Sequence, residues 1–215
     1  MSSKQSAIAS LNAHILTCVQ CQLSVTRIHA LPGEGGLNAR LMLIALAPGE
    51  KEDATGCMFI GPSGIVLDKL LAAAGIRRES VYMTNLIKCR LPKNRRPKME
   101  EIGCCRPILE KEIAIIGPEV LVPLGYYATR AVFQITCVKA PPARADYKAC
   151  YGRLFYAEKQ TILPLPHPSS LLYNPSYEPA TTEKYRKLGV LTQECEWFPA
   201  CPMKRFHASG RLNEK

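Results

Sequence analysis

The chain has 215 residues and a formal net charge of +10 at pH 7, from 28 Lys and Arg against 18 Asp and Glu. No run of about 18 apolar residues occurs, which excludes a transmembrane helix of the usual kind, and we expect no membrane partner. Hydrophobic residues make up 47% of the chain, an ordinary share for a globular protein with a full core. The positive charge suits a polyanion such as nucleic acid, although it can also serve solubility alone.

The cysteines are numerous for a chain without a secretory signal. The N-terminal segment MSSKQSAIASLNAHIL lacks the charged start and long apolar stretch of such a signal, so we expect an intracellular, cytoplasmic protein. Ten cysteines stand at positions 18, 21, 57, 89, 104, 105, 137, 150, 195 and 201. A disulfide scaffold is not expected in this setting. Some cysteines are therefore expected to bind a metal or cluster, and the others to be small buried residues.

The predicted elements alternate between helices and strands along the chain. Apolar spacing and turn residues predict helices over 3–17, 63–74, 99–116, 126–133 and 179–191, and strands over 41–46, 81–84, 120–124 and 161–165. Ser63 is expected to cap the second helix and Gly75 to end it. Residues 24–40 and 136–159 are expected to be mainly loop or hairpin. The pattern predicts an α/β fold, with a single domain over 1–215, a central four-stranded parallel sheet flanked by helices, and a mixed tail at 195–215.

Polar and aromatic groups follow three of the predicted strands, where open α/β sheets hold ligands. They are the Ala47 backbone, Glu52 and Phe59 after the first strand, Asn85 after the second, and His167 after the fourth. Asn offers a donor and an acceptor to an amide edge such as that of a base, and Phe stacks on a flat ring. His can donate to a departing oxygen near neutral pH. Each residue alone has a plain structural explanation, but together they predict a pocket for a planar polar ring.

The cysteine pattern indicates a second site. Cys18 and Cys21 have CxxC spacing, Cys89 follows the second strand, and Cys105 lies on the next helix beside a competing Cys104. Thiolates favour zinc or iron–sulfur clusters, and spacing alone leaves zinc and buried free thiols open.

A basic loop follows the second strand and ends before the next helix. Within eleven residues stand Lys88, Arg90, Lys93, Arg95, Arg96 and Lys98. Such a segment is typical of phosphate binding, and a solvated charged loop is the alternative.

In these motifs the chain resembles family 4 uracil-DNA glycosylases, the iron–sulfur type. The resemblance runs from about Cys18 to Tyr177. It rests on CxxC at 18–21, APGEKEDATGCMFIGPSG at 47–64, TNLIKCRLPKNRRP at 84–97, VPLG at 122–125 and HPSSLLYNP at 167–175. It implies the three-layer fold of that superfamily and a monomeric protein of a prokaryote or phage, acting on uracil-containing DNA, single- or double-stranded.

The resemblance implies a cofactor and a set of roles. A 4Fe–4S cluster would be held by Cys18, Cys21, Cys89 and Cys105. Phe59 would stack on a flipped-out uracil, Asn85 would read its edge, the Ala47 backbone would contact the ring, and Glu52 would line the pocket. His167 would stabilise charge on uracil O2. Asn94 matches a position near the active site, and DNA would be contacted by Arg90, Lys93, Arg95 and Arg96 and by the wedge segment with Ser169, Ser170 and Leu171.

The chain departs from the family pattern at two positions. Leu46 stands where the family usually has Glu, and Met58 stands where it usually has Pro before Phe59. Loss of a polar group at an active site can cost several kcal/mol of transition-state stabilisation. Two functions therefore stay open: a uracil-DNA glycosylase, and a catalytically weakened relative that binds DNA or a protein. A third alternative, a zinc-stabilised nucleic-acid-binding protein unrelated to repair, would require the motif series to be coincidence.

Overall fold

The structure, a computed structural model, describes residues 3–197. Its helices are α1 (Ser3–Thr17), α2 (Leu23–Thr26), α3 (Glu50–Thr55), α4 (Pro62–Ala73), α5 (Met99–Ile116), α6 (Tyr126–Ile135), α7 (Tyr147–Cys150), α8 (Ser169–Tyr173) and α9 (Glu178–Trp197). Its strands are β1 (Glu34–Gly35), β2 (Leu41–Ala45), β3 (Val81–Asn85), β4 (Val120–Pro123), β5 (Phe155–Tyr156) and β6 (Thr161–Ile162). Within the described residues, none of the helices has the length and apolarity needed to cross a membrane.

The six strands form one sheet in the order β1-β3-β2-β4-β6-β5. Its centre is the four-stranded parallel sheet that the sequence predicts, because β2 pairs in parallel with β3 and β4, and β4 pairs in parallel with β6. Short antiparallel strands extend it at each edge, β1 beside β3 and β5 beside β6. No strand was predicted at β1, and β5 was placed in irregular or hairpin-like chain, because a two-residue strand has no periodicity of its own.

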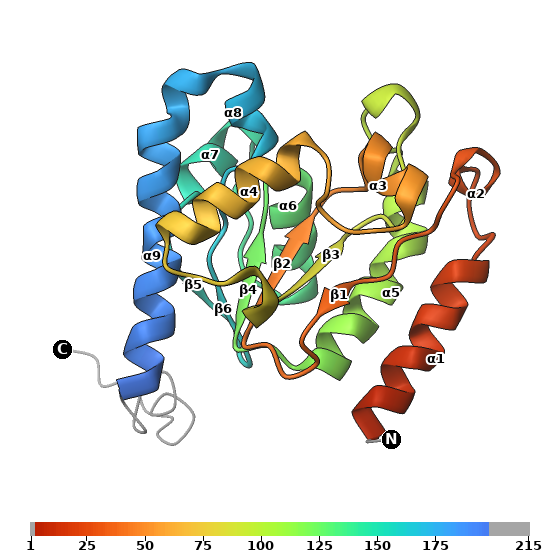
Figure 1. Cartoon of the computed structure of the whole chain (residues 1–215), viewed down its shortest axis with the longest axis horizontal. Helices are drawn as coiled ribbons and strands as arrows, with labels where there is room; N and C mark the ends of the chain where they lie inside the picture. The colour runs from red at the N-terminus through yellow and green to blue at the C-terminus, as the bar shows by residue number, and fades with distance from the viewer. Residues whose placement is uncertain (1–2, 198–215) are drawn as a thin grey trace.

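Helices cover both faces of the sheet, as Figure 1 shows. Alternate residues of β2 separate the two sides, since Met42 and Ile44 pack in one core cluster and Leu41 and Leu43 in the other. The first cluster takes residues from α1, α5 and α6, and the second from α4, α8 and α9. These two helix layers around one sheet are the expected three-layer architecture.

The bounds of the first four predicted helices, α1, α4, α5 and α6, agree closely with the structure, apart from one cap. Helices α1 and α5 have the predicted bounds, and Gly75 follows α4 with a φ of 71°. Ser63, however, lies inside α4, which begins at Pro62 with Gly61 in the N-cap position. The reason is that Pro is well suited to the first turn of a helix, where its missing N–H costs nothing.

The last predicted strand is shorter in the structure, and the last helix is longer. Pairing continues beyond β6 through a Leu124–Leu165 bridge, but Pro164 has no N–H to donate to a ladder. Helix α9 runs to Trp197, past the predicted end at 191. Of the predicted tail, residues 198–215 lie outside the described residues.

Candidate active site

The side chains predicted to form the pocket come from one edge of the sheet. Ala45, the last residue of β2, is the register partner of Asn85, the last residue of β3. On the other side, Leu124 pairs with Leu165, two residues before His167. Because these strands are parallel, the loops after them all leave at the carboxyl edge (Figure 1).

Glu52 lies on α3 and is folded against the backbone of two loops. Its carboxylate is buried, and Oε1 accepts a hydrogen bond from the Gly61 N–H at 2.7 Å. A Cβ at Gly49 would lie 2.5 Å from Oε2, so a side chain at that position would displace the carboxylate. Glu52 thus ties the loop after β2 to the start of α4.

Phe59 is held in an unusual backbone conformation. It is buried and has a φ of 52°, the left-handed region that bulky residues rarely adopt. Gly64 lies directly against it, since a Cβ at that glycine would come within 1.7 Å of the Phe59 carbonyl oxygen. The ring therefore leaves the chain from a tight, closely packed turn.

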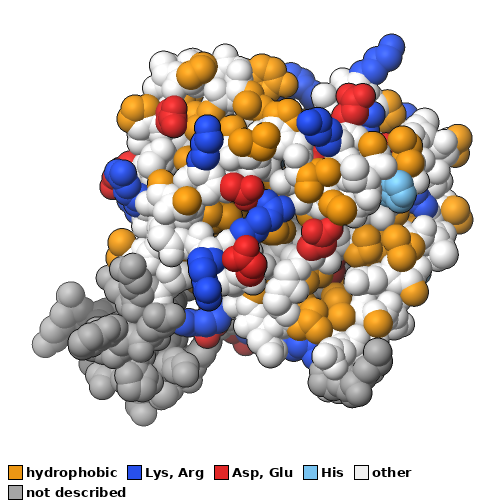
Figure 2. Space-filling view, viewed as in Figure 1, with side chains coloured by type: hydrophobic (Ala, Val, Ile, Leu, Met, Phe, Trp, Pro, Cys, Tyr) orange, Lys and Arg blue, Asp and Glu red, His pale blue; other side chains and the backbone are white. Residues whose placement is uncertain are grey.

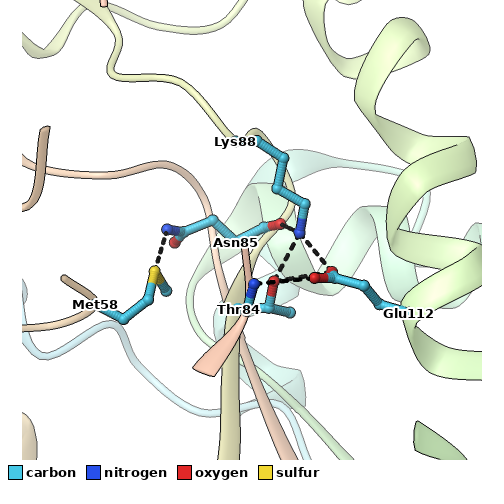
Figure 3. A network of polar contacts seen from close by, with 6 residues as sticks. Met58, Thr84, Asn85, Lys88 and Glu112 are labelled. Carbon is cyan, nitrogen blue, oxygen red and sulfur yellow. Dashed lines mark hydrogen bonds and ion pairs between the residues drawn. The ribbon is translucent and has the colours of Figure 1, made fainter. Parts of the chain in front are cut away.

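Asn85 is buried at the end of β3, beside the turn that carries Phe59. Figure 3 shows its amide directed at Met58, with Nδ2 donating to the Met58 sulfur at 3.4 Å. A thioether is only a weak acceptor, so this contact orients the amide without occupying its full hydrogen-bonding capacity. The side chain thus keeps a donor and the Oδ1 acceptor for a ligand.

His167 has one ring nitrogen engaged by its own turn. Nδ1 accepts from the Ser169 N–H at 3.1 Å and lies 2.8 Å from the Ser169 hydroxyl. As Nδ1 is an acceptor, the neutral ring carries its proton on Nε2. Surrounding protein disfavours the imidazolium and lowers the pKa of His167 from 6.5 to about 4. His167 is therefore a neutral Nε2–H donor at physiological pH.

Lys88 corrects the prediction that the whole basic loop faces a polyanion. It is buried, and its ammonium donates to Thr84 Oγ1 at 2.6 Å, to the Asn85 carbonyl at 2.8 Å and to Glu112 Oε2 at 2.5 Å (Figure 3). A buried ammonium needs an opposite charge, and Glu112 on α5 supplies it. Glu112 was missed at the level of sequence, because only the packing of α5 against β3 brings it there.

The rest of the basic loop is on the surface but partly neutralised. Arg90 pairs with Glu50 at 3.0 Å, and Arg95 pairs with Glu101 at 2.5 Å, which lowers the pKa of that carboxyl. The exposed residues of this segment include Lys93, Asn94 and Arg96. In Figure 2 acidic and basic side chains mix over the visible face. Basic side chains project at the upper right of that view.

Helix α8 corrects part of the predicted DNA-contacting segment. Leu171 is buried in the core cluster with α4 and α9, so it does not face solvent. The exposed apolar side chains of α8 are Leu172 and Tyr173, which are 47% and 85% exposed. Ser170 donates to the His167 carbonyl at 2.8 Å. Which residue of a short helix faces solvent depends on how the helix is rotated about its axis, and a motif of a few residues does not define that rotation.

The cysteines predicted to share a site line one pocket. They are Cys18, Cys21, Cys89, Cys104 and Cys105, with Arg27 and Lys88 beside them. Within residues 3–197 no group of acidic, His and Cys side chains is close enough for a single metal ion. The pocket brings five thiols together, and thiolates are ligands both of zinc sites and of iron–sulfur clusters.

Protonation of the cysteines also bears on ligation. Burial raises the pKa of Cys105 to about 12 and raises that of Cys89. Arg27, which no sequence motif indicated, donates to the Cys89 sulfur at 3.1 Å and opposes the shift. Without a metal these thiols stay protonated, so binding must displace their protons.

The two departures from the family pattern occupy apolar surroundings. Leu46 is half-buried and packs against the first core cluster, beside Ala47. A leucine here adds apolar contact where the family pattern has a carboxylate. Met58 is buried and contacts Asn85, as described above.

Fold and site together define an α/β protein with a buried Phe, an amide and a neutral imidazole at the carboxyl edge of its sheet. A family model described as the uracil DNA glycosylase superfamily matches residues 32–188. The chain belongs to this superfamily.

Similar proteins include three that carry the name type-4 uracil-DNA glycosylase. The protein from Saccharolobus solfataricus is 37% identical over 172 residues, 80% of this chain and 80% of its own length. That from Sulfurisphaera tokodaii is 34% identical over 190 residues, 86% and 84% of the two chains. The protein from Archaeoglobus fulgidus is 33% identical over 177 residues, which cover 82% of this chain and 89% of its own length.

Proposed function

We propose that this protein is a uracil-DNA glycosylase, which flips uracil out of DNA and hydrolyses its N-glycosidic bond to leave an abasic site. The observation that carries the proposal is the neutral His167 donor on the same sheet edge as the Phe59–Asn85 pair. The names of the similar proteins support uracil as the base. Base flipping is required because the glycosidic bond is inaccessible inside a duplex.

The side chains divide the work between recognition and charge stabilisation. Phe59 stacks on the uracil face, and Asn85 accepts from N3–H and donates to O4, an arrangement that cytosine cannot match. As the bond from the sugar to N1 breaks, its electron pair moves into the ring, and His167 Nε2–H stabilises the charge on O2. Water adds to the sugar carbon and releases a proton. Glu52 and the Ala47 backbone complete the wall of the pocket.

DNA is held by the surfaces that flank this pocket. The exposed Lys93 and Arg96, with Arg90 and Arg95, neutralise phosphates, and Asn94 lies among them. On the other side Ser169 and Ser170 hold the turn of His167, and the exposed Leu172 occupies the space the base leaves. We propose that the chain does this as a monomer.

We propose a 4Fe–4S cluster as the cofactor of the cysteine pocket. We assign Cys18, Cys21, Cys89 and Cys105 as its ligands, with Cys104 as the alternative to Cys105. When bound, the cluster supplies a structural cross-link between the segment after α1, the loop after β3 and α5, with no redox step on the substrate.

Cluster ligation is tested by composition and colour. The purified protein should be brown and contain iron and sulfide in equal amounts, and Cys18→Ser should lower both. Cys137→Ser, at an exposed cysteine outside the pocket, is the matched control and should keep them. Zinc in place of iron in the parent would contradict the assignment.

Uracil release from a labelled oligonucleotide tests the activity. The parent should release uracil, and Asn85→Ala and His167→Ala should each lose roughly 100-fold or more, the size expected for a lost transition-state donor. Asn38→Ala and His14→Ala, at exposed positions, are the matched controls and should leave release unchanged. Equal rates in the site variants and the parent would contradict the proposed roles.

The alternative function, a catalytically weakened binding module, rests on Leu46 alone. It is not favoured, because the similar proteins are named as glycosylases.

A further inference from the structure

We propose that Arg78 and Glu34 form a clamp on the Met58–Phe59 turn, as positioning residues that fix the ring-stacking Phe59 and the Asn85 amide relative to each other. Neither lies in a motif that points to function in the sequence. The inference rests on the proposed function, since it assigns these two residues to the same site.

The Phe59 turn needs support from outside itself. Its φ of 52° is unfavourable for a residue with a bulky side chain, and such a conformation persists only where surrounding contacts impose it. Gly64 makes room for the turn but donates nothing to its carbonyls, so other groups must hold it.

Arg78 supplies that support from one side. Its guanidinium donates through Nη2 to the Met58 carbonyl at 2.6 Å and through Nη1 to the Phe59 carbonyl at 3.3 Å. The same Nη1 lies 2.7 Å from Asp68 Oδ1, which fixes the guanidinium from the solvent side. The planar guanidinium of arginine has several N–H donors in fixed directions, so it can bind two successive carbonyls at once. The ammonium of lysine lacks this fixed geometry.

Glu34 supplies support from the other side. Its Oε1 accepts from the Met58 N–H at 2.9 Å, so the N–H and the carbonyl of this residue are both bound by charged side chains. Hydrogen bonds to charged groups are the stronger kind. The Met58 backbone is thus fixed at both of its polar groups.

The clamp reaches the base-reading residue through the Met58 side chain. The Met58 sulfur accepts from Asn85 Nδ2 at 3.4 Å, so a shift of the turn changes the stacking ring and the amide together (Figure 3). Both clamp residues are anchored beside β3, because Glu34 is the register partner of Met83, and Arg78 begins the 3-10 turn that leads into β3. Asn85 thus ends the strand beside which both clamp residues are held.

Hydrogen exchange tests the clamp without relying on activity. In Arg78→Ala, amide exchange of the peptide covering 57–64 should accelerate roughly tenfold, the change expected from losing a charge-assisted hydrogen bond. Arg77→Ala is the matched control, because it removes the same charge from the exposed neighbouring residue. Equal exchange in the two variants would overturn the proposal. If Arg78→Ala does not fold, Arg78→Lys replaces it, because lysine keeps the charge and loses the planar guanidinium. Its exchange rate is then compared with that of Arg77→Ala in the same way.

A double-mutant cycle tests the role in the reaction. Arg78→Ala should raise KM for a uracil oligonucleotide roughly tenfold, with a smaller change in kcat. In a Phe59→Ala background, the same substitution should raise KM by less than about twofold. Glu34→Ala should act in the same direction, and Glu34→Gln, which keeps an acceptor oxygen, should restore most of the loss. Equal losses in the parent and Phe59→Ala backgrounds would overturn the role. A parent that releases no uracil would instead refute the proposed function, while the exchange result still decides the clamp.

Discussion

His167 shows how one backbone hydrogen bond can determine the chemistry of a residue. The Ser169 N–H occupies Nδ1, and this assigns the ring proton to Nε2. The surrounding protein then keeps the ring neutral far below the ordinary range of histidine. The neutral imidazole of His167 can therefore donate a hydrogen bond through Nε2–H, but it does not act as a cationic acid.

The acid limb of the pH–rate profile follows from this assignment. Because the pKa of His167 is lowered from 6.5 to about 4, kcat/KM for uracil release should stay level as the pH falls through 6.5. It should decline only near pH 4, where a proton on Nδ1 would break the bond from Ser169. Steady-state rates between about pH 8 and about pH 4 measure this. A fall centred at pH 6.5 that is absent from the residual activity of His167→Ala would contradict it.

Some individual residues could be placed from the sequence and others could not. Asn85 and His167 were placed at strand ends because apolar runs and turn residues mark where strands stop. Lys88 and Leu171 were misplaced, because burial depends on what packs opposite a residue, and Glu112 and α4 lie far from them in the sequence. Arg78 and Glu34 gave no motif signal, because their role appears only once the turn at Phe59 is formed.

At the scale of elements, the Lys88–Glu112 ion pair joins the segment after β3 to α5. Its ammonium also binds the Asn85 carbonyl, and the next residue, Cys89, lines the cysteine pocket. The pair therefore stands between the two sites of the protein. Buried pairs are costly to form, but breaking one leaves a buried charge without a partner.

This pair yields a stability prediction. Lys88→Met leaves Glu112 buried and uncompensated and should lower the free energy of unfolding by about 3–5 kcal/mol, measured by chemical denaturation. The double variant Lys88→Met/Glu112→Leu should recover part of that loss. Lys93→Met, at an exposed position of the same loop, is the control and should change stability by less than about 0.5 kcal/mol. A Lys88→Met protein as stable as this control would show that the buried pair contributes nothing.

Prediction of elements succeeded where periodicity is long and failed where it is short. Helices α1 and α5 had their full bounds predicted, since each presents several turns of apolar spacing. Helix α3 was predicted as loop, because its six residues carry three acidic side chains and too few apolar ones for a pattern. The edge strands were missed or left unresolved for the same reason of length.

At the scale of the whole molecule, alternating strands and helices were enough to predict a parallel sheet covered on both faces. The ordering β3-β2-β4-β6 brings the loops after β2, β3 and β6 to one edge of the sheet, where the separate motifs meet. The sequence could not supply the contacts between those loops, because they depend on side chains from elements outside the motifs. Although the net charge is +10, basic side chains are interspersed with acidic ones on the face seen in Figure 2.

The proposed excision of uracil is best tested by base release from matched single-stranded oligonucleotides that carry uracil, cytosine or thymine at one position. We expect the parent protein to release free uracil and to retain cytosine and thymine, and we expect Asn85→Ala to lose the release of uracil. Absence of uracil release from a folded, cluster-containing protein, or equal release of cytosine, would contradict the assigned function.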